Sequence, residues 1–91
     1  MKVIVRDAAA AELDAAVAWI SRDSPRAASK LKKQIVERIN HLAIPGLSSI
    51  GRRGQISGTR ELIVPPYIIV YEVDGTAGEV IVLAIMHAAR D

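Results

Sequence analysis

Several residue types that carry chemistry are missing from this chain or scarce in it. There is no cysteine, which excludes disulfides, thiolate nucleophiles and cysteine-based zinc sites. There is no phenylalanine and only one tryptophan, although 51% of the residues are hydrophobic, so the core must be built from aliphatic side chains. The two histidines, His41 and His87, have no acidic or histidine neighbour at ligand spacing, so we expect no metal site and no cofactor.

Long hydrophobic runs are also absent. No apolar stretch approaches the roughly 20 residues that span a bilayer, and acidic residues occur too early in the chain for a secretory signal. Together with the lack of cysteine, these features indicate a soluble, cytoplasmic protein with no membrane partner. The length predicts a single domain over residues 1–91.

Charge is unevenly distributed along the chain. Residues 24–60 carry eight basic residues and one acidic residue, whereas residues 61–91 carry one basic residue and five acidic ones. Such a basic block attracts nucleic acid or an acidic protein partner, or it is simply the solvated face of a helix.

Hydrophobic periodicity predicts the element order β-α-α-β-β-β. Alternation predicts a strand over 2–6, and helical spacing predicts helices over 8–22, capped by Asp7, and from Pro25 to about residue 43, capped by Ser24. The runs 59–64, 67–74 and 79–87 predict strands, and residues 44–58 predict a long loop. We therefore predict an α+β fold in which an α-helical hairpin packs on a mainly antiparallel four-stranded sheet.

The last two predicted strands are apolar on both faces. In the strand 79–87 both alternating sets are apolar, one being Val80, Val82, Ala84 and Met86 and the other Ile81, Leu83 and Ile85. Two helices cover only one face of a sheet, and an antiparallel sheet normally leaves its other face polar. We infer that another chain covers the second face.

Two residues stand apart on the predicted helices. Trp19 lies at the edge of its apolar stripe, where it either seals the core or anchors a partner. Arg38 falls within the apolar arc of the second helix, among Ala28, Leu31, Ile35, Ile39 and Leu42. Arg38 either snorkels to the edge of that arc or faces a partner or a carboxylate such as Glu12.

Four polar residues gather at the predicted end of the sheet: Arg60, Glu61, His87 and Arg90. Metal-free RNA cleavage requires a base, an acid and a cation, and these residue types supply all three. The alternative is that Arg60 and Glu61 are ordinary charges at a strand edge. The sequence has no phosphate-binding glycine loop, no G-x-S-x-G element and no aromatic pair that would stack bases.

Over essentially its whole length, the chain resembles the RelE/ParE superfamily of bacterial type II toxin–antitoxin toxins. The resemblance rests on the element order, on INHLAIPGLSSIGRRG after the second helix, and on GTRELIV, YIIVYEV and VIVLAIMHAARD in the last three strands. In this superfamily, RelE-like members are ribosome-dependent mRNA interferases, and ParE-like members poison DNA gyrase without cutting nucleic acid.

The motifs look more like the ParE-like, plasmid-stabilisation branch. RelE-like nucleases carry an arginine three residues before the tyrosine of the third strand, where this chain has Ile68, and lysines in the second strand, where it has Arg60, Glu61 and Leu62. Arg90 matches their arginine after the last strand, but their C-terminal tyrosine helix has no counterpart. The resemblance implies a non-enzymatic gyrase inhibitor. The alternatives are an mRNA interferase that uses Glu61, His87 and Arg90, or a non-toxic remnant that only binds antitoxin.

The resemblance also implies a partner, a ParD-like antitoxin whose acidic C-terminal segment wraps the toxin and suits the basic block. The candidate antitoxin-binding residues are Trp19, Leu31, Ile35, Arg38, Ile68 and Val70. The candidate target-binding residues are Arg52, Arg53, Arg60, His87 and Arg90. We expect no sequence-specific DNA binding by this chain.

Overall fold

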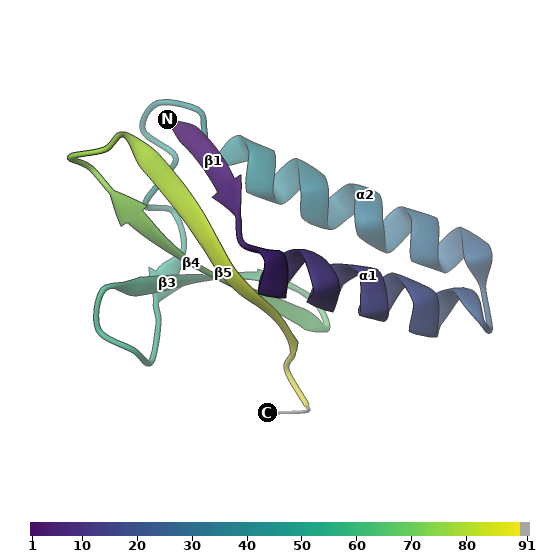
Figure 1. The fold of residues 1–91 in the computed structure, drawn as a ribbon. Helices are drawn as coiled ribbons and strands as arrows, with labels where there is room; N and C mark the ends of the chain where they lie inside the picture. The colour runs from purple at the N-terminus through teal and green to yellow at the C-terminus, as the bar shows by residue number, and fades with distance from the viewer. Residues whose placement is uncertain (90–91) are drawn as a thin grey trace.

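Two helices lie on one side of a single five-stranded sheet in the computed structural model, which describes residues 1–89 (Figure 1). The elements are β1 (Lys2–Val5), α1 (Asp7–Ser21), α2 (Pro25–His41), β2 (Arg52–Arg53), β3 (Thr59–Val64), β4 (Tyr67–Asp74) and β5 (Glu79–His87). The strand order is β1-β5-β4-β3-β2, with β1 parallel to β5 and every other pair antiparallel. The predicted α+β fold is confirmed, and β3, β4 and β5 have the predicted bounds.

The fifth strand is a difference from the prediction of four. The segment 44–58, predicted as a loop, contains β2, whose residues pair with β3 as Arg52 with Glu61 and Arg53 with Arg60. A strand of two residues is too short to show an alternating pattern. Only its pairing with β3 defines it, so the sequence alone gave no signal for it.

The two helices begin differently. Asp7 is not the cap that the sequence suggested: it is the first residue of α1, and Arg6 stands before it without a side-chain capping bond. The Asp7 carboxylate instead lies in the first turn, where negative charge is favoured by the helix dipole. Ser24 does cap α2, because its Oγ accepts the Ala27 N–H at 3.1 Å and Pro25 opens the helix.

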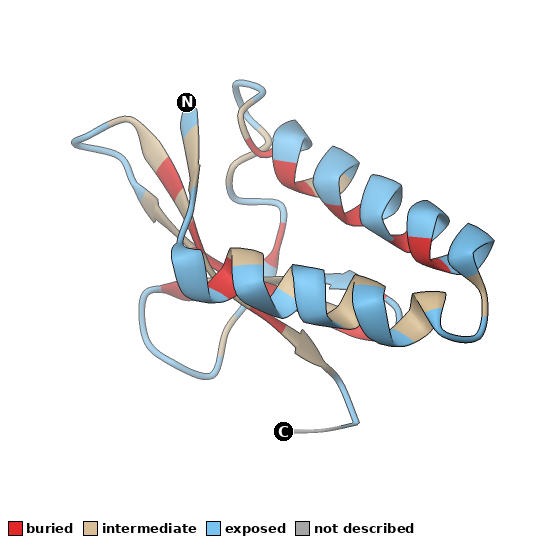
Figure 2. Cartoon of the chain, turned by 45° about the vertical axis from the view of Figure 1, so that its right-hand side comes forward, coloured by how far each residue is buried: buried red, intermediate tan, exposed pale blue. Residues whose placement is uncertain are grey.

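The core lies between the helices and one face of the sheet (Figure 2). The buried stripe of α2 is the predicted one, namely Ala28, Leu31, Ile35 and Ile39, and it continues into Leu42, which caps the end of the helix. The strands contribute Leu62, Ile69, Tyr71, Val80, Val82 and Ile85. Each fully buried aliphatic side chain of this kind stabilises the fold by about 1.5–3 kcal/mol relative to an exposed one.

A bulge in β5 changes which residues face the core. Leu83 is an extra residue there, because two steps along β5 match one step along β4. Beyond the bulge the faces exchange, so Ile85 is buried in the core while Ala84 and Met86 lie on the opposite face. The predicted grouping of Ala84 and Met86 with the valines of the first half is wrong, since one inserted residue shifts a period-2 pattern by one position.

The sheet face away from the helices, which we call the open face, is partly apolar. By their cross-strand pairing, its aliphatic residues are Ile4, Ile63, Ile68, Val70, Ile81, Ala84 and Met86. Most of them are half-buried, and Ile63 is 37% exposed. None of the helices in residues 1–89 lies on this face (Figure 1). A partly apolar second face was predicted and is confirmed, and its coverage by another chain stays a prediction.

Candidate functional site

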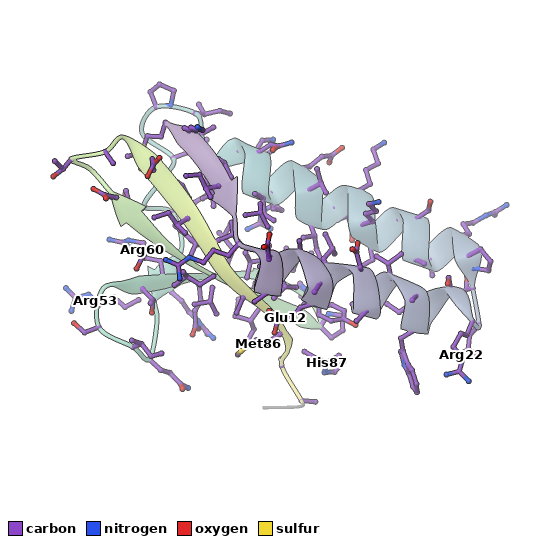
Figure 3. The ribbon with its side chains drawn as sticks, in the orientation of Figure 1. Glu12, Arg22, Arg53, Arg60, Met86 and His87 are labelled. Carbon is purple, nitrogen blue, oxygen red and sulfur yellow. The ribbon has the colours of Figure 1, made fainter. Side chains whose placement is uncertain are left out.

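The polar residues predicted to form one cluster lie apart. Arg60 pairs with Tyr71 and His87 pairs with Tyr67, and these partners are four positions apart on β4. At about 3.3 Å per residue, the two sites are separated by roughly 13 Å along the strand. Figure 3 likewise shows Arg60 and His87 well separated. The predicted single cluster is therefore wrong for this pair, and Arg90 lies outside the described residues.

Arg60 anchors the segment that leads into β2. Its Nη1 donates to the carbonyls of Ser49, at 3.1 Å, and Gly51, at 2.9 Å. The Gly51 N–H in turn donates to the buried Tyr71 hydroxyl at 3.0 Å. A Cβ at position 51 would lie 2.7 Å from that hydroxyl oxygen, so the close approach requires glycine. Arg60 thus holds local structure in place, in addition to any contact with a target.

Glu61 lies on the open face and is neutralised across the ladder by Arg52. The Arg52 Nη2 lies 2.9 Å from Glu61 Oε1, and Nε donates to the same oxygen at 3.0 Å. The Glu61 side chain is only 11% exposed, whereas that of Arg52 is 61% exposed. A carboxylate oxygen that is already engaged by a guanidinium group, as Oε1 is here, is poorly placed to accept a proton from a substrate.

His87 lies at the end of β5, against an aromatic neighbour. Its ring meets Tyr67 edge to face, with the centroids 5.2 Å apart and the planes at 82°. Its Nδ1 accepts the Ala89 N–H at 3.1 Å. In a neutral imidazole with Nδ1 as acceptor, Nε2 carries the hydrogen and is a donor. The ring therefore has no nitrogen left to act as a general base while this bond is present.

A groove of about 490 Å³ runs between α1 and the second half of β5. The strand β1 pairs with β5 only as far as Val82, so the Ile85 N–H lies beyond the end of that pairing. Glu12, on the α1 side of the groove, supplies the missing acceptor: its Oε1 accepts the Ile85 N–H at 3.0 Å. Figure 3 shows Glu12, Met86 and His87 near one another at this end of the sheet. The lining is largely apolar and includes Trp19, Tyr67, Met86 and His87. The sequence did not indicate this groove, because it depends on the bulge and on where α1 docks.

Two of the residues predicted to bind antitoxin are unavailable to a partner. Leu31 is 7% exposed and Ile35 is fully buried, both in this chain's own core. The prediction is wrong for these two because the apolar stripe of α2 faces the sheet. By contrast, Trp19 is 55% exposed, with the Arg22 guanidinium 5.2 Å from its ring centroid. The remaining candidates on the sheet, Ile68 and Val70, lie half-buried on the open face.

Arg38 reaches the edge of the sheet. Its Nη1 lies 3.5 Å from the Ile63 carbonyl oxygen, a long hydrogen bond on the part of β3 that β2 does not cover. The suggested partner Glu12 is engaged elsewhere, with the Ile85 amide. This geometry agrees with the interpretation of Arg38 as a snorkelling arginine, with its stem along the apolar arc and its head at the sheet edge.

The described part of the chain holds neither a cluster of metal-ligating side chains nor a helix suited to a membrane. Within residues 1–89, no three side chains of histidine, aspartate or glutamate gather in a way that would hold a metal ion. Neither α1 nor α2 combines the length and the apolar character that crossing a membrane requires.

Comparison with known proteins gives the class and then the family. A helical hairpin on one face of a mostly antiparallel sheet is shared with toxins of type II toxin–antitoxin systems. A family model described as "ParE toxin of type II toxin-antitoxin system, parDE" matches residues 3–91, and the chain belongs to this family.

Individual relatives agree with this assignment. "Putative toxin Y4kP" of Sinorhizobium fredii is 38% identical over 78 residues, which cover 84% of this chain and 76% of that protein. A chain of the chromosomal ParDE TA system from P. aeruginosa has a TM-score of 0.81 at 28% identity, covering 96% of this chain and 95% of that one. A chain of the toxin–antitoxin complex RelBE2 from Mycobacterium tuberculosis has a TM-score of 0.54 at 20% identity, covering 94% and 88%, and supports the fold alone.

Proposed function

We propose that this toxin inhibits DNA gyrase in the cytoplasm, as ParE-like toxins do, and that it does not cut nucleic acid. The observation that carries the proposal is the position of Ile68. By resemblance, a RelE-like nuclease carries an arginine there. In this chain the cross-strand neighbours of Ile68 are Ile63 and Met86, so the position lies in an aliphatic patch of the open face. An aliphatic side chain in such a patch provides no charge for a phosphate.

The other nuclease candidates support the same choice. Glu61 Oε1 is already engaged by Arg52 through a hydrogen bond and an ion pair, and His87 Nδ1 accepts a backbone N–H, so these two atoms are not placed to act as general bases. The likeness to the ParDE chain, at a TM-score of 0.81 and 28% identity, adds support for a ParE-like activity.

A cognate ParD-like antitoxin holds the toxin inactive in this proposal. The solved relatives come from toxin–antitoxin systems, and the open face offers a partly exposed aliphatic surface that includes Ile68 and Val70. An antitoxin segment that folds on binding would bury this surface. Trp19 lines the groove beside β5 and Arg38 contacts β3 on the other side of β4, so a segment that touches both must wrap around the toxin.

Target contact is assigned to three arginines and a histidine of the sheet, Arg52, Arg53, Arg60 and His87, and to Arg90, which lies outside the described residues. Arg52 already has a counter-charge in Glu61, so in this proposal Arg53 contributes the larger share of the attraction on β2.

Expression of the chain without its antitoxin tests the proposal. We expect gyrase–DNA cleavage complexes to accumulate while mRNA stays intact, and co-expression of the antitoxin to suppress the DNA breaks. Ribosome-dependent cuts in mRNA would overturn the proposal in favour of a RelE-like interferase. The absence of both effects would indicate a remnant that only binds antitoxin.

A further inference from the structure

The hairpin of β2 and β3 places two arginines side by side, and no described residue supplies them with a counter-charge. Arg53 and Arg60 are direct partners in the antiparallel ladder, which puts their Cβ atoms about 5 Å apart on one face. Like charges in this arrangement destabilise a sheet. The acid of the hairpin, Glu61, belongs to the neighbouring pair and binds Arg52, and no ion pair of Arg53 or Arg60 is found among residues 1–89. The arrangement therefore favours a bound anion that would relieve the repulsion.

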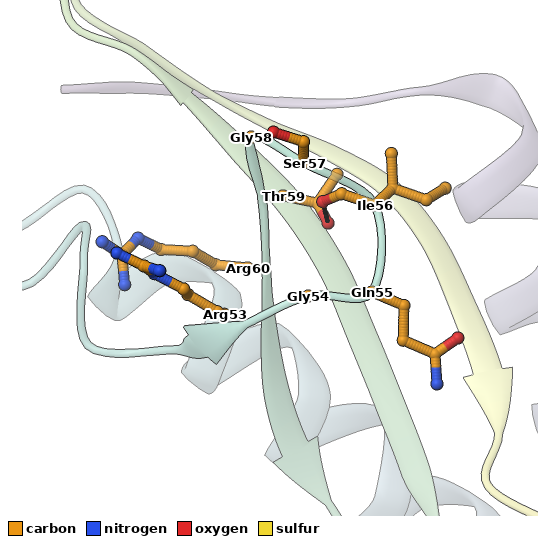
Figure 4. A pocket seen from close by; sticks show the side chains of 8 residues that line it. All are labelled: Arg53, Gly54, Gln55, Ile56, Ser57, Gly58, Thr59 and Arg60. Atoms are coloured by element: carbon orange, nitrogen blue, oxygen red, sulfur yellow. Dashed lines mark hydrogen bonds between the residues drawn. The ribbon is translucent and has the colours of Figure 1, made fainter.

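Both arginines border one hollow of about 560 Å³ (Figure 4). Their side chains extend to the same side of the hairpin, whereas those of Gln55 and Ile56 extend to the other side. The carbonyls of Ser49 and Gly51 hold Arg60 Nη1, which fixes that guanidinium before any ligand arrives. A side chain that is already ordered loses less conformational entropy on binding.

The turn that joins β2 to β3 is also ordered. The Thr59 N–H and Oγ1 both donate to the Ile56 carbonyl, at 3.1 and 2.6 Å. The Gly54 N–H donates to the Thr59 carbonyl at 2.9 Å. The hairpin is therefore a defined two-stranded ribbon that presents its two unneutralised arginines on one side.

We propose that Arg53 and Arg60 bind the phosphate backbone of duplex DNA, independently of base sequence. Guanidinium groups match phosphate oxygens with paired hydrogen bonds, and most protein–DNA hydrogen bonds go to the backbone from arginine, polar side chains and backbone N–H groups. A two-stranded ribbon enters the major groove of B-DNA, whereas the major groove of duplex RNA is too narrow for side chains to read.

An acidic protein segment fits this hollow less well. Protein interfaces place apolar residues in a fully buried centre. The one large apolar residue of this lining, Ile56, is directed away from the two arginines (Figure 4). The inference goes beyond gyrase inhibition, because it assigns to DNA itself two arginines that the proposed function gives only to target contact, and it is tested without gyrase.

The test is the salt dependence of binding to a short labelled DNA duplex, followed by fluorescence anisotropy with the full chain. The slope of log K against log salt concentration is negative, and each phosphate neutralised adds about 0.9 to its magnitude. We expect Arg53→Gln to reduce that magnitude by about 0.9 and Arg53→Lys to preserve it. Arg26→Gln is the matched control: it removes one charge from an exposed residue at the start of α2 and leaves the slope unchanged.

Three results would overturn the proposal. One is no duplex binding by the unaltered chain at the lowest salt concentration. Another is an equal change in slope for Arg53→Gln and Arg26→Gln, which would mean that only the net charge matters. The third is displacement of the duplex by a polyglutamate peptide at equal or lower charge concentration, which would assign the hollow to an acidic protein segment. Unchanged melting temperatures would show that both glutamine variants are folded.

Discussion

The two faces of the sheet are built from the same kinds of residue but differ in how far their side chains are buried. On the helix-covered face, Ile69 and Tyr71 of β4 are fully buried. Their neighbours in the same strand, Ile68 and Val70, lie half-buried on the open face. Successive residues of one strand therefore alternate between a packed core and an uncovered surface. The apolar character of a side chain therefore does not tell whether it stabilises the core or is available to a partner; that depends on whether the helices cover it.

The largest expected effect comes from two adjacent isoleucines on opposite faces. Ile69→Ala should lower the free energy of unfolding by about 2–5 kcal/mol, because it leaves a cavity in a core with few alternatives for filling it. Ile68→Ala should lower it by less than about 1 kcal/mol, because the side chain is already partly solvated. Urea denaturation of the chain without a partner measures both values.

Binding should reverse that order. If the open face receives the antitoxin, Ile68→Ala should weaken antitoxin binding, measured by titration calorimetry, more than Ile69→Ala does once both variants are shown to be folded. Equal losses of stability for the two variants would contradict the division of the sheet into a packed face and an open one.

The buried hydroxyl of Tyr71 gives the next largest effect. Tyr71→Phe leaves the buried Gly51 N–H without its acceptor, and we expect a loss of about 1–3 kcal/mol in chemical denaturation. Tyr67→Phe serves as the control, since that ring is also buried but its hydroxyl holds no hydrogen bond of this kind within residues 1–89. A loss for Tyr67→Phe as large as that for Tyr71→Phe would indicate a general cost of removing a tyrosine hydroxyl rather than the lost bond to Gly51.

The cap of α2 tests how much the start of this helix contributes to the stability of the layer that covers the sheet. Ser24→Ala removes the acceptor of the Ala27 N–H, and we expect a loss of about 1 kcal/mol in thermal or urea unfolding. Ser29→Ala, at an exposed position inside the same helix, should be neutral or slightly stabilising, because alanine is the better helix former. A Ser29→Ala loss equal to that of Ser24→Ala would argue against a capping role.

The smallest effect is expected on the open face. Glu61→Gln breaks the ion pair with Arg52, most of whose side chain is in solvent, so the loss should be only about 0.2–1 kcal/mol. It should shrink as salt is added, because screening weakens the pair in the unaltered chain. A loss that is independent of salt in denaturation curves would point to packing of Glu61 rather than its charge.

Much of the fold was predictable because its elements are long and strongly patterned. The apolar stripe of α2 and the Ser24–Pro25 start both follow from local chemistry, and both are confirmed. The strand β2 and the bulge at Leu83 were not predictable, because each is defined by a partner strand rather than by its own residues. Asp7 shows the same limit on a smaller scale, since its sequence allows either a cap or a first-turn position.

The candidate site was less predictable than the fold. Residues such as Arg60 and His87 have suitable chemistry, but the register of β4 separates them. Arg52 and Arg53 are adjacent in sequence, yet alternation sends the first to Glu61 and the second to Arg60. Which charge is neutralised is thus a property of strand pairing.

By itself, the sequence determined that the core is mostly aliphatic, the order of the helices and long strands, and the presence of apolar residues on both faces of the sheet. These depend on side-chain type and on spacing along the chain, which are local. Only the tertiary structure decided which face of the sheet the helices cover and where the bulge exchanges the faces of the β5 side chains. It also decided that Arg53 pairs with Arg60 while Glu61 pairs with Arg52. Such contacts depend on the register between distant segments, and a shift of one residue would have exchanged every one of them.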